Sequence, residues 1–241
     1  METSLTRRRN IENISQQGSS LTSSSKIYED LFLIACLRSD MPIICDALSM
    51  SLRVAALADL AFDNLLDINN DVVIVKEGVI NDPILDEIYN KIRIASFNLR
   101  DMLISLNGES FKSKYIKVHV KRLRDKISKK LEEEGKIRYE NKKFGLRKGR
   151  PKVDENVKIQ LSCKIVSYLN SRDFCLRTEV LIACLIYCNG VKPLLFSVPQ
   201  NKVAIMRTKL ENIRKRYVEA KFINEPPDRI IYGLLKTLFK L

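Results

Sequence analysis

The sequence predicts a single, mostly α-helical domain with one or two small β-hairpins. Apolar residues recur at helical spacing through most of the chain after residue 26. Runs of β-branched residues are short, and no linker or change of composition divides the chain beyond that point. With 241 residues and 45% hydrophobic content, the chain is long enough to bury a core.

The first 25 residues differ from the rest. They have no apolar period and contain a serine-rich run between Ser19 and Ser25. Such a segment cannot bury enough apolar surface to offset its ordering entropy. We therefore expect a flexible Arg/Ser-rich tail at 1–25 and a folded domain at 26–241.

In the first half of the domain, apolar spacing predicts helices at 27–36 and 46–66. A β-branched run followed by a glycine-containing turn predicts a small hairpin within 66–80. A proline begins the next predicted helix, at 83–91. Another is expected at 97–106, where an Asn-Gly pair ends it.

The second half begins with a predicted basic helix from Ile116 to Leu131, whose apolar residues form a narrow stripe. A hairpin should follow, with strands at 137–139 and 143–146. The segment Gly149-Arg150-Pro151 is expected to break regular structure. Further helices are predicted at 157–169, 177–188, 202–221 and 228–241.

The net charge of +13 is concentrated in one segment. Residues 110–152 hold 17 Lys or Arg against five acids, a net of +12, while the remainder has 25 basic against 24 acidic residues. A local positive field of this kind attracts anionic surfaces or ligands. A solvated surface that only aids solubility is the alternative interpretation.

Several function classes find no support. Apolar runs such as Leu31 to Leu37 are too short to span a bilayer, so a soluble chain is expected. The single histidine, His119, is interpreted as a surface or half-buried helix residue, and no recognisable nucleophile and base pair accompanies it. Cys184 and Cys188 lack the further ligands that zinc needs, and no glycine-rich phosphate loop occurs. We expect a protein without enzymatic activity, metal or cofactor. Its free cysteines fit a reducing, cytosol-facing compartment.

The basic segment offers a candidate anion site. On one continuous helix, Lys117, Lys121 and Arg124 would share a face. Arginine supplies a planar fork and lysine a compact charge, a mixture that suits a phosphate monoester.

The chain resembles the Golgi phosphoprotein 3 family from about Ile27 to Leu241. The stretches that carry the likeness are KIYEDLFLIACL, CDALSMSLRVAALADLAF, DPILDEI, MLISLNGES and VKRLRDKISKKLEEEGKIRYENKKFGL. Their order and spacing, rather than any one short motif, make the resemblance specific.

The resemblance implies a mostly helical domain on the cytoplasmic face of Golgi membranes, peripheral and also cytosolic. It would bind phosphatidylinositol 4-phosphate, coatomer (COPI) and the cytosolic tails of glycosyltransferases, which it retains in the Golgi. By the same resemblance, Arg53, Lys121 and Arg124 would hold the lipid phosphate, and the coatomer-binding element would be Arg7, Arg8 and Arg9.

Two departures from the family are visible. Ile44 stands where the family has a tryptophan in a membrane-inserting loop, and it lacks the ring that suits the headgroup level. The predicted hairpin, which supports self-association in the family, is followed here by the basic run 147–152. Membrane attachment should therefore depend more on charge, and homo-oligomerisation is left open.

Two other functions remain open at this stage. A basic helix followed by a basic hairpin is also typical of winged-helix nucleic-acid binding. A duplex, however, gives no role to the arginine cluster at 7–9 or to the apolar loop at 42–44, so a partner other than nucleic acid is preferred. A scaffold that binds only other proteins is the third reading.

Overall fold

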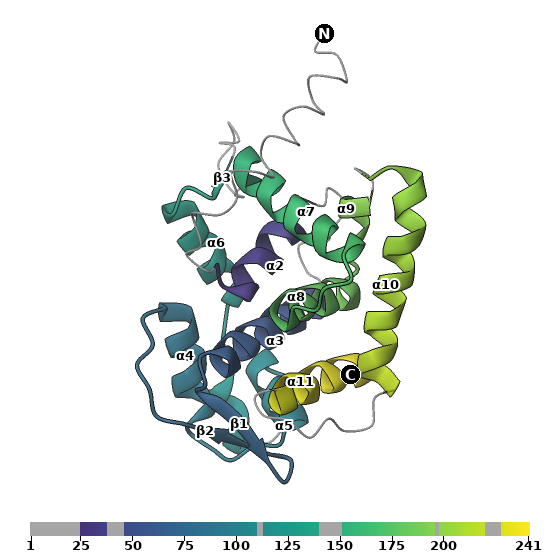
Figure 1. Cartoon of the computed structure of the whole chain (residues 1–241). Coiled ribbons are helices and arrows are strands. Elements are labelled where there is room, and N and C mark those ends of the chain that lie inside the picture. Colours follow the sequence, from purple (N-terminus) through teal and green to yellow (C-terminus); the bar gives the residue numbers. More distant parts are fainter. Residues whose placement is uncertain (1–24, 38–45, 110–112, 140–150, 196–197, 220–227) are drawn as a thin grey trace.

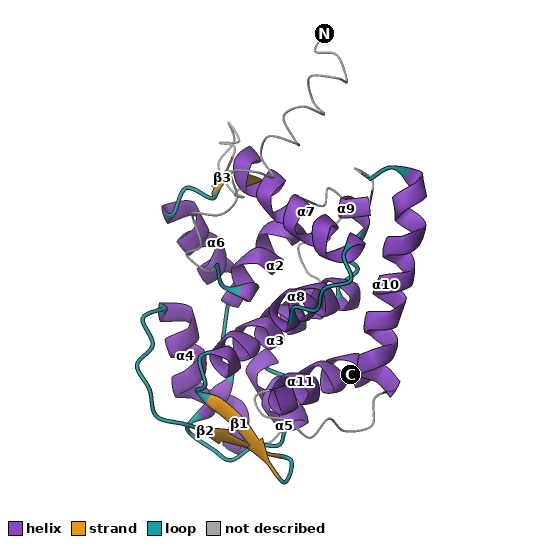
Figure 2. Ribbon diagram, viewed as in Figure 1, coloured by secondary structure: helices purple, strands orange, loops and turns teal. Residues whose placement is uncertain are grey.

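The computed structural model describes residues 25–37, 46–109, 113–139, 151–195, 198–219 and 228–241. Over these residues the chain is mainly helical, with two small antiparallel sheets (Figure 2). The predicted fold class is confirmed. The expected tail at 1–25, apart from Ser25, lies outside the described residues.

Figure 1 shows the helices and strands, coloured from the N-terminus to the C-terminus. The helices are α2 (Ile27–Cys36), α3 (Asp46–Phe62), α4 (Pro83–Ile92), α5 (Leu99–Asn107), the 3-10 helix η1 (Ser113–Val118), α6 (Leu123–Glu133), α7 (Glu155–Asn170), α8 (Leu176–Tyr187), α9 (Lys192–Leu195), α10 (Gln200–Glu219) and α11 (Asp228–Lys240). The strands are β1 (Leu66–Asn69), β2 (Val72–Val75), β3 (Ile137–Tyr139) and β4 (Pro151–Val153).

Helix α3 forms the centre of the domain. Its sequence is rich in alanine and leucine, which favour helix, and every residue from 50 to 61 is buried. Helices α2, α4, α5, α8 and α11 all pack against it, while α10 lies along the outer edge in Figure 1. Because all faces of α3 are covered, residues on it are fixed in position.

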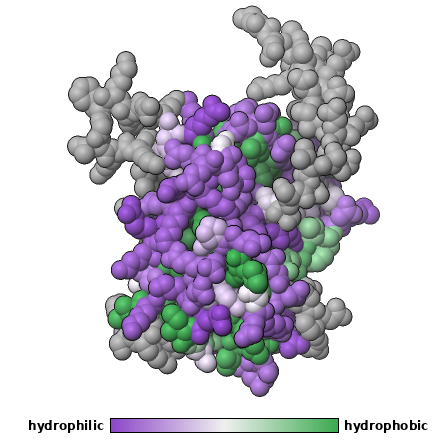
Figure 3. Space-filling view, turned by 90° about the vertical axis from the view of Figure 1, so that its left-hand side faces the viewer, coloured by the Kyte–Doolittle hydropathy of each residue, from purple (hydrophilic) through white to green (hydrophobic). Residues whose placement is uncertain are grey.

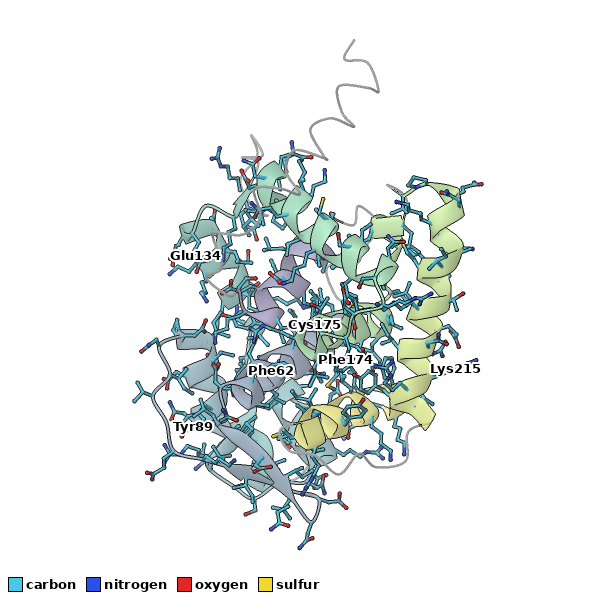
Figure 4. All side chains as sticks on the ribbon, in the orientation of Figure 1. Phe62, Tyr89, Glu134, Phe174, Cys175 and Lys215 are labelled. Atoms are coloured by element: carbon cyan, nitrogen blue, oxygen red, sulfur yellow. The ribbon has the colours of Figure 1, made fainter. Side chains whose placement is uncertain are left out.

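Helix ends near α3 are set by local side chains. The Asp82 carboxylate accepts hydrogen bonds from the amides of Ile84 and Leu85, at 2.9 and 3.0 Å, and caps α4. Tyr89 of α4 donates to the carbonyl of Lys76 at 2.8 Å, which ties α4 to the segment after β2 (Figure 4). The predicted boundaries of this helix and of the β1–β2 hairpin are confirmed within a few residues.

The predicted single basic helix from Ile116 to Leu131 is wrong. A 3-10 helix ends at Val118, the chain turns through Arg122, which has φ of 54°, and α6 begins at Leu123. The amide of Val120 donates to the carbonyl of Leu106 at 3.2 Å, a tertiary contact that replaces a helical one. Ile116, predicted to face the core, is 63% exposed.

The second hairpin also differs from the prediction. Strand β3 pairs with β4, with Ile137 opposite Val153, so Pro151 begins a strand instead of breaking regular structure. Proline is tolerated there because the first residue of a short strand need not donate to the ladder. The predicted partner strand at 143–146 lies outside the described residues.

The remaining boundaries are close to those predicted. Helices α7, α8, α10 and α11 begin and end within two residues of the predicted bounds. Helix α3 ends at Phe62, four residues before the predicted end, and the four-residue α9 was not predicted.

A buried ionic network holds α6 in place. The Lys130 ammonium lies 2.5 Å from carboxylate oxygens of both Glu29 and Asp82 and donates to the Tyr28 hydroxyl at 2.8 Å. Burial alone would lower the pKa of Lys130, but its hydrogen bonds to Asp82 and Glu29 raise that pKa above its usual value. The network joins α6 to α2 and to the start of α4, with Glu134 at the outer end of α6 (Figure 4).

Candidate anion-binding site

Arg53, on α3, is buried and donates four hydrogen bonds within the protein. It is 3% exposed. Its Nε donates to the carbonyl of Leu106 at 2.8 Å, and its Nη2 donates to the carbonyl of Val120 at 2.7 Å. Its Nη1 donates to both the carbonyl and the hydroxyl of Ser49, at 2.9 and 2.7 Å.

These bonds make Arg53 a bridge between three segments: α3, the last turn of α5, and the turn that precedes α6. The resemblance implied that Arg53 contacts the phosphate, whereas the structure directs its guanidinium to backbone carbonyls. Burial and, to a smaller extent, the charge of Arg124 lower the pKa of Arg53, while Glu109 raises it, and together these effects bring the pKa to about 10. Arg53 is therefore still a cation at neutral pH, and its charge lies beneath the turn.

Lys121 and Arg124 lie above this buried charge. Lys121 is exposed in the turn, and Arg124 is half-buried in the first turn of α6, within electrostatic reach of Arg53. The prediction that Lys117, Lys121 and Arg124 share a face of one helix is wrong, because they occupy η1, the turn and α6. The fold, and not helical spacing, brings Lys121 and Arg124 near one another.

Two further residues join the site. His119 lies half-buried in the turn, and its ring packs against Gly108 at the end of α5. Burial lowers the pKa of His119, and the charges of Arg53, Lys121 and Lys91 lower it further. The Lys91 ammonium donates to the carbonyl of Lys117 at 2.6 Å. We call Arg53, Lys91, Lys121 and Arg124 the cation cluster, and His119 is their neighbour.

The backbone adds to the positive potential. The N-terminus of a helix carries a partial positive charge and amides without intrahelical partners. The N-cap of α6 is Arg122, whose side chain makes no capping hydrogen bond and is instead paired with Asp125 at 2.8 Å. The start of α6 thus combines a helix terminus with the cation cluster, an arrangement suited to binding a phosphate group.

Along the rest of α6 and just after it, several basic side chains are paired within the protein. Lys126 lies 2.5 Å from Glu87, Lys130 lies between Glu29 and Asp82, and Lys136 lies 2.9 Å from Glu29. The net charge of the segment therefore overstates the field that a partner would meet along α6. The cationic surface is concentrated at the N-terminal end of this helix.

Sequence reasoning missed Lys91 and the place of His119. Lys91 belongs to α4, and nothing in its sequence neighbourhood indicates that α4 ends beside η1. His119 lies between two valines, and both are buried. That pattern indicated a half-buried position but not its cationic neighbours.

Other predicted functional residues cannot be placed. Arg7, Arg8, Arg9 and Ile44 lie outside the described residues. Within the described ranges, no group of three or more His, Cys, Asp or Glu side chains is arranged to hold a metal ion. The same part of the chain contains no helix whose length and apolar character would allow it to cross a membrane.

Comparison with known proteins identifies the family of the chain. No curated protein matches the sequence. The model of one protein family, described as Golgi phosphoprotein 3 (GPP34), matches residues 27–225, which is most of the chain and contains the whole cation cluster. The chain belongs to the Golgi phosphoprotein 3 family, which associates it with the Golgi.

Proposed function

We propose that the chain is a peripheral Golgi adaptor that binds the phosphorylated headgroup of phosphatidylinositol 4-phosphate at the cation cluster. The observation that carries this proposal is the convergence of Lys121 and Arg124 on the N-terminus of α6, above the buried charge of Arg53. A phosphate monoester carries close to two negative charges and three acceptor oxygens. It matches a lysine, an arginine and a helix terminus held in one place.

In this proposal the residues have different tasks. Lys121 and Arg124 contact the phosphate, whereas Arg53 is a positioning residue that holds the turn against α5 and adds a fixed charge from below. His119 is a neighbour whose charge depends on pH. The role is binding without catalysis.

The internal ion pairs of α6 argue against a nucleic-acid function. A helix in a major groove needs several free cations along its length. Here Lys126 and Lys130 are engaged by acids from α4, its cap and α2. A phosphate monoester at the helix end requires none of these side chains.

The lipid proposal is tested by flotation with vesicles that contain phosphatidylinositol 4-phosphate, compared with phosphatidylserine vesicles of equal charge. We expect preferential binding to the first kind, and at least a tenfold loss in the variant Lys121→Ala with Arg124→Ala, since hydrogen bonds to charged groups contribute about 1.5–3 kcal/mol each. Lys129→Ala is the matched control, because Lys129 lies on the same helix and its side chain is 76% exposed. Equal binding to both vesicle types, or equal effects of the two variants, would contradict the proposal.

The adaptor role rests on family membership and on the sequence of the N-terminal segment. We expect coatomer to bind the full chain. Replacement of Arg7, Arg8 and Arg9 by alanine should abolish this binding. Peptides with the sequence of glycosyltransferase tails should still bind this variant. Coatomer binding that is unchanged in the triple variant would contradict the assignment of these arginines.

A further inference from the structure

Two isoleucines stand exposed beside the cation cluster. Ile116 of η1 is 63% exposed and Ile94, just after α4, is 57% exposed. Ile116 directly precedes Lys117, whose carbonyl accepts the hydrogen bond from Lys91. Ile94 follows Lys91 by three residues. Along the chain, each isoleucine thus lies within three residues of a partner in the contact that joins α4 to η1.

These side chains do not cover the core below them. The core under this surface is already closed by Ile92 and Val118, which are 1% and 0% exposed. Single exposed apolar side chains are common on protein surfaces, but these two have basic residues close by in the sequence. Apolar side chains next to lysines are favourable at a bilayer surface, where the apolar side chains enter the acyl boundary and the ammonium groups remain among the phosphates.

The surroundings of the two isoleucines favour a bilayer as the partner. Lys117, Lys121 and Arg122 are exposed on the same short segment as Ile116, and they complement an anionic leaflet. The face that carries α4 and α6 is mostly hydrophilic, with hydrophobic residues in separate patches toward its lower end (Figure 3). Isolated apolar tips among cations suit a fluid lipid surface, which needs no matching shape.

We infer that Ile94 and Ile116 enter the membrane when the cation cluster binds its lipid. This inference rests on the proposed function, because it takes the cluster to face a bilayer. It adds an apolar contact that is independent of Ile44, the residue that stands at the position of the family tryptophan. Charge then selects the membrane, and the two isoleucines hold the domain at a defined depth.

The absence of tryptophan from the sequence allows a direct test. The variants Ile116→Trp and Ile94→Trp each place a single fluorescent reporter at one site. Ile205→Trp is the matched control, since Ile205 is 59% exposed on α10, and this helix lies across the domain from α4 and α6 in Figure 1. With phosphatidylinositol 4-phosphate vesicles, we expect a blue shift and quenching by brominated acyl chains for the first two variants and neither change for the control.

A second measurement separates the apolar contact from phosphate recognition. Ile94→Ser with Ile116→Ser should weaken vesicle binding about tenfold or more. It should leave binding of the soluble headgroup, glycerophosphoinositol 4-phosphate, unchanged. The variant Lys121→Ala with Arg124→Ala should weaken binding of vesicles and of the soluble headgroup. Ile205→Ser should weaken binding of neither.

The outcomes distinguish the two proposals. Vesicle binding by the wild-type chain without an emission shift in Ile94→Trp or Ile116→Trp overturns the inference and leaves the lipid site intact. An emission shift that is equally large on phosphatidylserine vesicles, with no preference for the phosphoinositide, supports the apolar contact and overturns the specific lipid site. A shift produced by coatomer but not by vesicles overturns the membrane assignment.

Discussion

Replacement of Arg53 by methionine should destabilise the domain strongly, although the resemblance assigns this residue to a ligand. The substitution keeps an apolar stem and removes the guanidinium. The carbonyls of Leu106 and Val120 then lose charged donors at 2.8 and 2.7 Å in a buried setting. Two such bonds contribute about 3–6 kcal/mol, and removal of a desolvated charge offsets part of that loss.

We therefore expect the free energy of unfolding to fall by about 3 kcal/mol. For a domain of this size, that loss lowers Tm by about 6–12 °C. Urea unfolding and a thermal scan measure the two quantities, with Arg138→Met as the control, because Arg138 is exposed on β3. A Tm within 2 °C of the wild type would refute the bridging role and return Arg53 to the set of direct phosphate contacts.

Gly108 and His119 give two further predictions. Gly108→Ala should lower the free energy of unfolding by about 1–2 kcal/mol, because φ is 83° and the new Cβ would lie 2.7 Å from the His119 ring. Gly135→Ala is the control in the same urea titration. Gly135 has φ of 71° and open space around it, so this variant measures the cost of the backbone conformation alone. Burial and then the neighbouring cations lower the pKa of His119, and a bound phosphate would raise it. Protons and phosphate should therefore bind cooperatively, so the ratio of wild-type to His119→Gln vesicle affinity should rise as the pH falls from 7.5 to 5.5. A ratio that stays constant over this range would remove His119 from the site, and titration of the lipid itself cancels in the comparison.

Most of the fold could be predicted because its signals are local. Apolar periodicity and capping residues locate α4, α7, α8, α10 and α11 within two residues. The predicted basic helix failed because a non-local contact overrides a local preference. The residues from Ile116 to Leu131 have a helical apolar period, yet the carbonyl of Leu106 and the guanidinium of Arg53 hold the backbone at Val120 in a turn.

The residues of the candidate site divide in the same way, into those that local sequence signals reveal and those that depend on tertiary packing. Lys121 and Arg124 could be found from the charge of one segment, together with the family resemblance. Lys91 could not, because its link to η1 depends on how α4 packs. The bridging role of Arg53 was also hidden, since a single arginine in an apolar helix indicates burial but does not identify the carbonyls that satisfy it.

The Lys130 network has a consequence for synthesis of the chain. Its partners Glu29 and Asp82 precede Lys130 by 101 and 48 residues, and closing such long loops is slow relative to forming one helix. Helix α6 thus acquires its final orientation only after α2 and the start of α4 are in place. If the proposed lipid site is correct, a nascent chain would lack it until the residues through α6 had left the ribosome, and immature copies would not bind the phosphoinositide.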